Sequence, residues 1–231
     1  MKTIAFPVVA HIGTMDRSLK DKGSYEGACL SVSIHPGAWS SIARLGGDGF
    51  VLSRVDGEPV TFVNATRLSR DEKAAIVDWG KQEGLLVDRE VYIASYYDIE
   101  DEATRKIECS TREEALAEVE DQPRKRVQGP KLVLGATEKL LTMSDQPISR
   151  HEISSDFAYD LVLLAYVEKN LRVDGVWWDE TLNVETLSAP RGAIFQDRLD
   201  AFEKHPMDFS HMYEEDDLND EELELGSAPT F

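Results

Sequence analysis

Short strand-like runs separated by glycine and proline turns constrain the fold of this 231-residue chain more than any other feature. Apolar residues in these runs are continuous or alternate with polar ones, as expected of strands with one or both faces buried. Helix-like segments lie between them, so the sequence predicts a single domain of the α+β class. The predicted strands cover residues 3–12, 28–36, 50–55, 59–68, 89–99, 104–110, 131–135, 175–178 and 188–195.

Capping patterns mark the starts of the predicted helices. Ser69 followed by Glu72 forms a capping box, in which each side chain satisfies a backbone amide of the other residue, ahead of a helix over 70–83. Further helices are predicted over 38–45, 111–121 (capped by Ser110 with Glu113), 136–143, 156–170 (capped by Ser155) and 196–205, with an exposed basic loop over 122–131.

The formal net charge of −19 is concentrated partly at the C-terminal end, where residues 212–231 hold eight acids and no Lys or Arg follows Lys204. Such composition is typical of a solvated, flexible tail, so we expect a domain over 1–205 and an acidic tail over 206–231. The charge argues against direct binding to nucleic acid phosphates, which needs clustered cations. A basic protein partner, bound through the tail, is compatible with it.

The rest of the composition excludes several classes of protein. Cys29 and Cys109 are too few for a disulfide framework or a cysteine zinc site. The five histidines are far apart without the spacing of metal ligands, so we expect no metal. No apolar run is long enough to cross a membrane, and the N-terminal run lacks a cleavage pattern, which predicts a cytoplasmic protein.

Three separated pieces remain as candidates for chemistry, since the common nucleotide-binding, hydrolase and metalloprotease motifs are absent. A predicted strand ends in His11, Gly13 and Thr14. The next strand carries Ser31 and Ser33 on alternate positions, and a late strand ends in Trp177, Trp178, Asp179 and Glu180.

The order of these pieces resembles that of the ADP-ribosyltransferase fold, in its branch with a His-x-Glu set of site residues. The resemblance spans residues 8–196 as motif order rather than continuous sequence, and residues 60–150 carry none of it. It implies two packed, mainly antiparallel sheets, flanked by helices, that form a cleft for NAD. It also implies roles for individual residues. His11 binds the riboses, and Gly13, with Thr14 next to it, binds the nicotinamide amide. Ser31 and Ser33 border the nicotinamide end, and Glu180 binds the 2′-hydroxyl of the nicotinamide ribose.

The sequence departs from that family in three places. Ile12 separates His11 from Gly13, the second strand has no aromatic counterpart, and Trp178 stands two positions before Glu180 where some members carry Glu or Gln. The acceptor is therefore open: a protein side chain, a nucleic acid base or terminal phosphate, a small molecule or water.

The chemistry of glycosidic cleavage explains why these residue types are needed. Breaking the bond between ribose and nicotinamide builds positive charge on the sugar, which a carboxylate such as Glu180 stabilises. An aromatic ring such as Trp178 can stack on the cationic nicotinamide. Strand alternation sends Trp177 and Trp178 to opposite faces, and Glu180 to the face of Trp178. Arg191, which follows in a turn, is a candidate ligand for a phosphate of NAD.

Two other classes of function stay open at this point. Each piece alone is also what an ordinary strand end carries, so the fold could bind a nucleotide or partner without catalysis. An acidic interaction protein that imitates DNA would instead occupy a nucleic-acid-binding enzyme through its carboxylates. A toxin, effector or phage-type role is compatible with the transferase interpretation.

Overall fold

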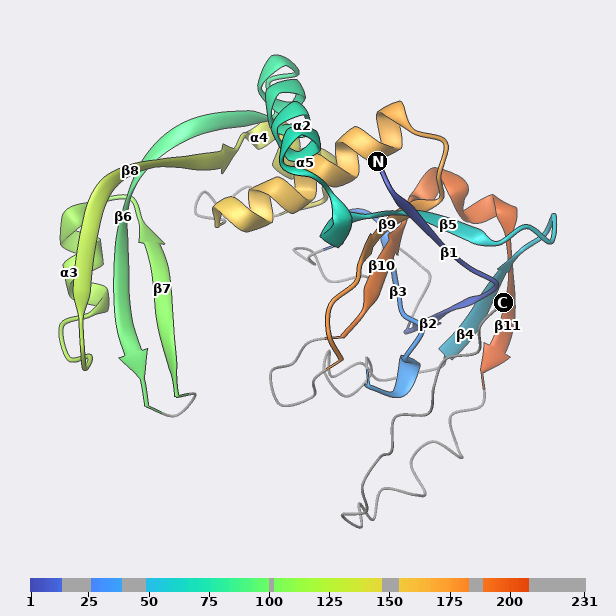
Figure 1. Ribbon diagram of the computed structural model, residues 1–231, viewed down its shortest axis with the longest axis horizontal. Helices are drawn as coiled ribbons and strands as arrows, with labels where there is room; N and C mark the ends of the chain where they lie inside the picture. Colours follow the sequence, from blue (N-terminus) through green and yellow to red (C-terminus); the bar gives the residue numbers. More distant parts are fainter. Residues whose placement is uncertain (14–25, 39–48, 100–101, 147–153, 183–188, 208–231) are drawn as a thin grey trace, which may run out of the picture.

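A computed structural model describes residues 1–13, 26–38, 49–99, 102–146, 154–182 and 189–207 (Figure 1). It is an α+β structure with several antiparallel sheets, which confirms the class predicted from the sequence. No helix in these ranges is both long and apolar enough to cross a membrane.

The central element is a five-stranded sheet of order β1-β5-β9-β10-β3. The pairs are antiparallel except that β5 and β9 run parallel. The strands are β1 (Thr3–Phe6), β5 (Val60–Asn64), β9 (Gly175–Trp178), β10 (Arg191–Ile194) and β3 (Leu30–Val32).

A three-stranded antiparallel sheet of order β11-β4-β2 packs against it, with β11 (Phe202–Met207), β4 (Gly49–Arg54) and β2 (Val9–Ile12). The two sheets are joined twice. The chain passes from β1 to β2 through Pro7, which cannot donate to a strand ladder, and Ala10 forms a bridge with Ser33 after β3. Their shared core contains Val9, Leu30, Val32, Leu52, Val60, Phe62, Trp177 and Ile194.

Helices cover the other face of the five-stranded sheet (Figure 1). The longest, α5 (Ser155–Asn170), is apolar almost all round and buried, as its seven buried residues require. It packs against α2 (Arg70–Gln82) and beside α4 (Glu138–Met143). Two 3₁₀ turns, η2 (Ala65–Arg67) and η3 (Gln196–Ala201), follow β5 and β10.

A third antiparallel sheet, of order β7-β6-β8, extends from this body as an arm (Figure 1). Its strands are β6 (Leu86–Asp98), β7 (Ala103–Cys109) and β8 (Arg126–Ala136). A short helix, α3 (Arg112–Glu118), covers one face of the arm through a separate small core around Ala94, Cys109, Ala115 and Val119.

Several predicted elements are confirmed and others are wrong. The capping box of Ser69 with Glu72 opens α2 as predicted. The predicted basic loop 122–131 is wrong from residue 126 onward, where the chain enters β8. The predicted helix 196–205 is instead a 3₁₀ turn followed by β11. The other two caps are displaced by one residue, to Thr111 with Glu114 and to Ser154, and the helix predicted over 38–45 lies outside the described residues apart from its first.

Replacing Gly175 tests the close approach of β9 and β10. A Cβ at Gly175 would lie 1.9 Å from the carbonyl oxygen of Ala193, so the strands must separate to admit it. We expect Gly175→Ala to lower the free energy of unfolding by about 3 kcal/mol or more, measured by urea denaturation. Gly135→Ala is the control, because its methyl meets only the flexible side chain of Arg89, at 2.9 Å; equal losses in the two variants would contradict this account.

Candidate functional site

The pairing of β9 with β10 places Trp178 directly opposite Arg191. The guanidinium of Arg191 lies over the Trp178 ring, 4.9 Å from its centroid. One terminal nitrogen of Arg191 lies 2.9 Å from Glu26 Oε1, and the other lies 3.4 Å from Glu180 Oε1. The Arg191 side chain is only 12% exposed, so these are contacts of a largely buried charge.

Asp160 on α5 is the fifth member of this group and contacts the indole nitrogen of Trp178. Trp178 Nε1 donates a hydrogen bond to Asp160 Oδ1 at 3.2 Å. Burial raises the pKa of Asp160 to about 6, although the Trp178 hydrogen bond and the charge of Arg191 act in the opposite direction. We call the five residues Glu26, Asp160, Trp178, Glu180 and Arg191 the Arg191 cluster.

The electrostatics of the cluster are dominated by carboxylates around one cation. Burial by itself lowers the pKa of Arg191, but Glu26 and Glu180 outweigh it and the net shift is upward, so the guanidinium stays charged. Both terminal nitrogens of Arg191 already contact carboxylates. A phosphate would have to compete with Glu26 and Glu180 for this side chain, whereas a cation near Glu180 would be attracted.

The predicted division of the two tryptophans is confirmed. Trp177 is fully buried between the sheets, with its ring centroid 4.5 Å from that of Phe6 and 5.5 Å from that of Phe62. Trp178 belongs to the core formed with α5 on the opposite face. Glu180 reaches Arg191 above the Trp178 ring and so lies on the side of Trp178.

The predicted serines lie in and directly after β3, the strand next to β10: Ser31 is within β3, on the face of the Arg191 cluster, and Ser33 follows it. Ser31 pairs with Ala193, and opposite residues share a face of the sheet. The Ser31 hydroxyl oxygen is buried without a hydrogen-bond partner in the described part of the chain. Ser33 is fully buried; its hydroxyl donates to the Pro190 carbonyl at 2.9 Å and accepts from the His35 amide at 3.0 Å. Ser33 therefore anchors the turn before Arg191.

His11 adjoins the same strand but not the cluster itself. Its Nδ1 donates to the Ser31 carbonyl at 2.8 Å. Along β2, His11 shares a face with Val9, which belongs to the core between the sheets, whereas Ala10 pairs with Ser33. The structure thus brings His11 to the Ser31 carbonyl and Glu180 to Arg191. His11 lies on the face of the core between the sheets, whereas Glu180 and Arg191 lie on the opposite face. Gly13 follows β2 with a φ of +105°, and Thr14 lies outside the described residues.

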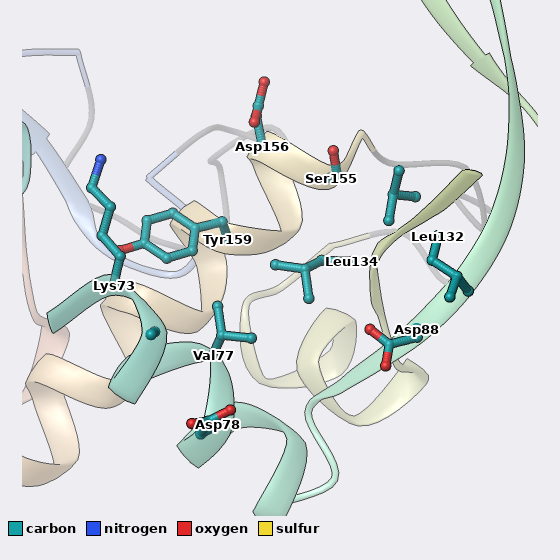
Figure 2. Close-up of a pocket in the computed structure, with 11 residues that line it drawn as sticks. Lys73, Val77, Asp78, Asp88, Leu132, Leu134, Ser155, Asp156 and Tyr159 are labelled. Carbon is teal, nitrogen blue, oxygen red and sulfur yellow. The ribbon is translucent and has the colours of Figure 1, made fainter. Parts of the chain in front are cut away.

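A separate groove of about 590 Å³ lies between α2, α5 and β8 (Figure 2). Its apolar wall includes Val77, Leu132 and Leu134, and charged residues surround it. Tyr159 borders it, and burial raises the pKa of its phenol to about 12. The groove contains none of the residues that the sequence predicted for a site. The lining residues are Lys73, Ala74, Val77, Asp78, Asp88, Leu132, Val133, Leu134, Ser155, Asp156 and Tyr159.

No family model matches the sequence, and neither a curated protein nor a solved structure shows significant similarity to it. Within the described ranges, no three His, Cys, Asp or Glu side chains are grouped as ligands of a metal ion would be. The site is therefore characterised by its own geometry.

Sequence reasoning missed two members of the cluster, Glu26 and Asp160. Glu26 is 165 positions from Arg191 and carries no local signal. Asp160 did carry one, because it is a lone acid within the apolar run of residues 157–167. A carboxylate in a helix that is buried on nearly all sides needs a partner, which here is Trp178.

Asp160 makes the stability of the fold depend on pH. Its pKa of about 6 in the folded chain lies above its ordinary value of 3.8, so the ionised carboxyl destabilises the fold above pH 6 by at most about 3 kcal/mol. This cost disappears as the pH falls from 6 towards 4. We expect Asp160→Asn, which keeps the acceptor for Trp178, to raise the melting temperature most at pH 7 and progressively less down to pH 4. The exposed Asp78→Asn is the control; a gain independent of pH for Asp160→Asn would contradict the assignment.

Proposed function

We propose that the chain is an NAD-dependent ADP-ribosyltransferase-like enzyme in which Glu180 stabilises the ribosyl cation. One observation carries this proposal: Glu180, 37% exposed, is anchored by Arg191 at the rim of an aromatic wall formed by Trp178. A carboxylate that is both fixed and accessible is what a reaction with developing positive charge requires.

In the proposed reaction, the bond between C1′ of the ribose and the nicotinamide nitrogen breaks, and its electron pair leaves with nicotinamide. The acceptor, or water, forms the new bond to C1′ and loses its proton. Arg191 positions Glu180, and the remaining carboxylates, Glu26 and Asp160, keep the surroundings negative while the sugar becomes cationic. The Trp178 ring and the buried face behind it exclude water, which strengthens this attraction.

His11 and Ser31 support a place for the rest of the dinucleotide. The contact of His11 with the Ser31 carbonyl fixes the imidazole at the junction of the two sheets. The buried Ser31 hydroxyl, on the face of the Arg191 cluster, has no hydrogen-bond partner among the described residues, so a ribose or amide group that displaced the residues covering it would satisfy it. The nicotinamide end of NAD would then lie on the face of Ser31 and Glu180, while His11 holds β3 from its other side through the Ser31 carbonyl.

Replacing Glu180 tests the proposal. We expect Glu180→Gln to reduce the release of nicotinamide from labelled NAD by about a hundredfold or more, with the melting temperature preserved because the amide still accepts from Arg191. The control is Asp179→Asn, which removes the adjacent exposed carboxylate and should keep the activity. Absence of NAD binding by the unaltered chain in calorimetry, or full activity of Glu180→Gln, would refute the proposal. In the second case, a biological effect that also survives in Glu180→Gln would favour the acidic interaction protein instead.

A further inference from the structure

The arm formed by β6, β7 and β8 has one covered face and one open face. Ala94 on β6 lies opposite Ile107 and Val127, and these residues pack against α3. The next position, Ser95, lies opposite Lys106 on β7 and Arg126 on β8. Since opposite residues share a face and successive residues alternate, these three side chains lie on the face away from α3. We call this the open face of the arm.

Positive charge is gathered on the open face. Lys106 and Arg126 are exposed on either side of Ser95, with their Cα atoms about 10 Å apart from the usual spacing of strands. Tyr97 lies two positions further along β6, and the guanidinium of Arg124 stacks over its ring at 4.8 Å from the centroid. None of Lys106, Arg124 and Arg126 forms an ion pair with another described residue.

Several acids of the arm are paired with cations, and most of the others lie on or beside α3. Glu108, at the base of the open face, is occupied by Arg89 at 2.6 Å and by the Ser155 hydroxyl at 2.7 Å. In Figure 1, α3 lies at the edge of the arm that is farther from the body, and the contact of Glu108 with Ser155 on α5 joins the base of the open face to the body. Asp98 contacts Arg105 at 3.3 Å, and Asp88 contacts Lys81 at 2.7 Å. The other described acids of the segment are exposed: Glu90 lies on β6, Glu102 lies directly before β7, and five lie on or beside α3, namely Glu113, Glu114, Glu118, Glu120 and Asp121.

We propose that the open face of the arm binds a short stretch of single-stranded nucleic acid. Three exposed cations without carboxylate partners complement phosphates, and the stacked pair of Tyr97 and Arg124 offers a flat surface for a base. An acidic peptide would use the cations but would gain little from the stacked ring, which is why we favour nucleic acid. The net charge of −19 opposes this only weakly, because charges more than about 10 Å away are screened at physiological salt.

The proposal has a defined salt dependence. Three phosphate contacts with a single strand give a slope of about −2 for the logarithm of the binding constant against the logarithm of salt concentration. Fluorescence anisotropy of a labelled 12-nucleotide strand, titrated with the full chain from 50 to 200 mM salt, measures this slope. Absence of binding at 50 mM salt, or equal binding of a duplex of the same sequence, overturns the proposal.

Charge reversal on the arm separates local from overall electrostatics. Lys106→Glu with Arg126→Glu should weaken binding at least tenfold and flatten the slope from about −2 to about −0.7, the value for one remaining phosphate contact. Lys2→Glu with Lys73→Glu changes the net charge of the chain by the same amount at exposed positions of the body, and should leave binding within about threefold. Equal losses in the two double variants would show a non-specific effect of charge and overturn the assignment.

Replacing the ring distinguishes a nucleic acid from an acidic peptide. Tyr97→Ala should weaken strand binding by about fivefold or more, with little change in the salt slope, because stacking is not ionic. Polyglutamate should compete poorly at equal charge concentration. Unchanged binding by Tyr97→Ala, together with effective competition by polyglutamate, would assign the open face to acidic polypeptides and overturn the proposal. These measurements need no NAD, so their outcome does not depend on whether Glu180 is a catalytic residue.

Discussion

The close approach of β9 and β10 at Gly175 and Gly192 is the constraint on which the rest of the body depends. A side chain at Gly175 would collide with the backbone of Ala193, and one at Gly192 would meet the Trp177 ring at 2.6 Å. Asp174, buried immediately before β9, accepts from the Thr61 amide at 2.8 Å and contacts Arg54 at 2.5 Å. This carboxylate therefore connects the start of β9 to β5 in one sheet and β4 in the other. Gly175 and Gly192 allow β10 to lie close to β9.

That pairing determines the chemistry of the candidate site. With Gly175 opposite Ile194, the register places Trp178 opposite Arg191, and the guanidinium must lie over the indole. A cation buried to this degree would be costly without partners. Glu180, directly after the neighbouring strand β9, and Glu26, remote in sequence, provide them. The exposed member, Glu180, gains a fixed position as a consequence. Packing constraints inside the sheet are thus transmitted to a carboxylate at its edge.

Local signals in the sequence predicted local features of the structure, and long-range pairing overrode the rest. The capping box of Ser69 with Glu72 needs only four residues, so it was predictable; the second box moved by one residue because Glu113 and Glu114 both follow a hydroxyl at the required spacing. Pro130 and Gly129 indicated a loop, yet they occupy an irregularity in the edge strand β8, where proline is tolerated. The residues after Ala201 have helical spacing, but pairing with β4 makes them a strand. Of the cluster, Trp178, Glu180 and Arg191 were singled out from the sequence, whereas the contact of Arg191 with Glu26 depends on tertiary structure alone.

The net charge describes neither of the two surfaces proposed for function. Around Arg191, three carboxylates of the cluster face one guanidinium, so the local field favours a cation at Glu180. On the arm, Lys106 and Arg126 flank Ser95 on one face, while five acids lie on or beside α3, which covers the other. A helix that covers one face of a sheet leaves the other face free to carry the opposite charge, and alternation along the strands then sorts the side chains between them. A sum over the sequence cannot detect this sorting, because it depends on the register of β6 with both of its neighbours.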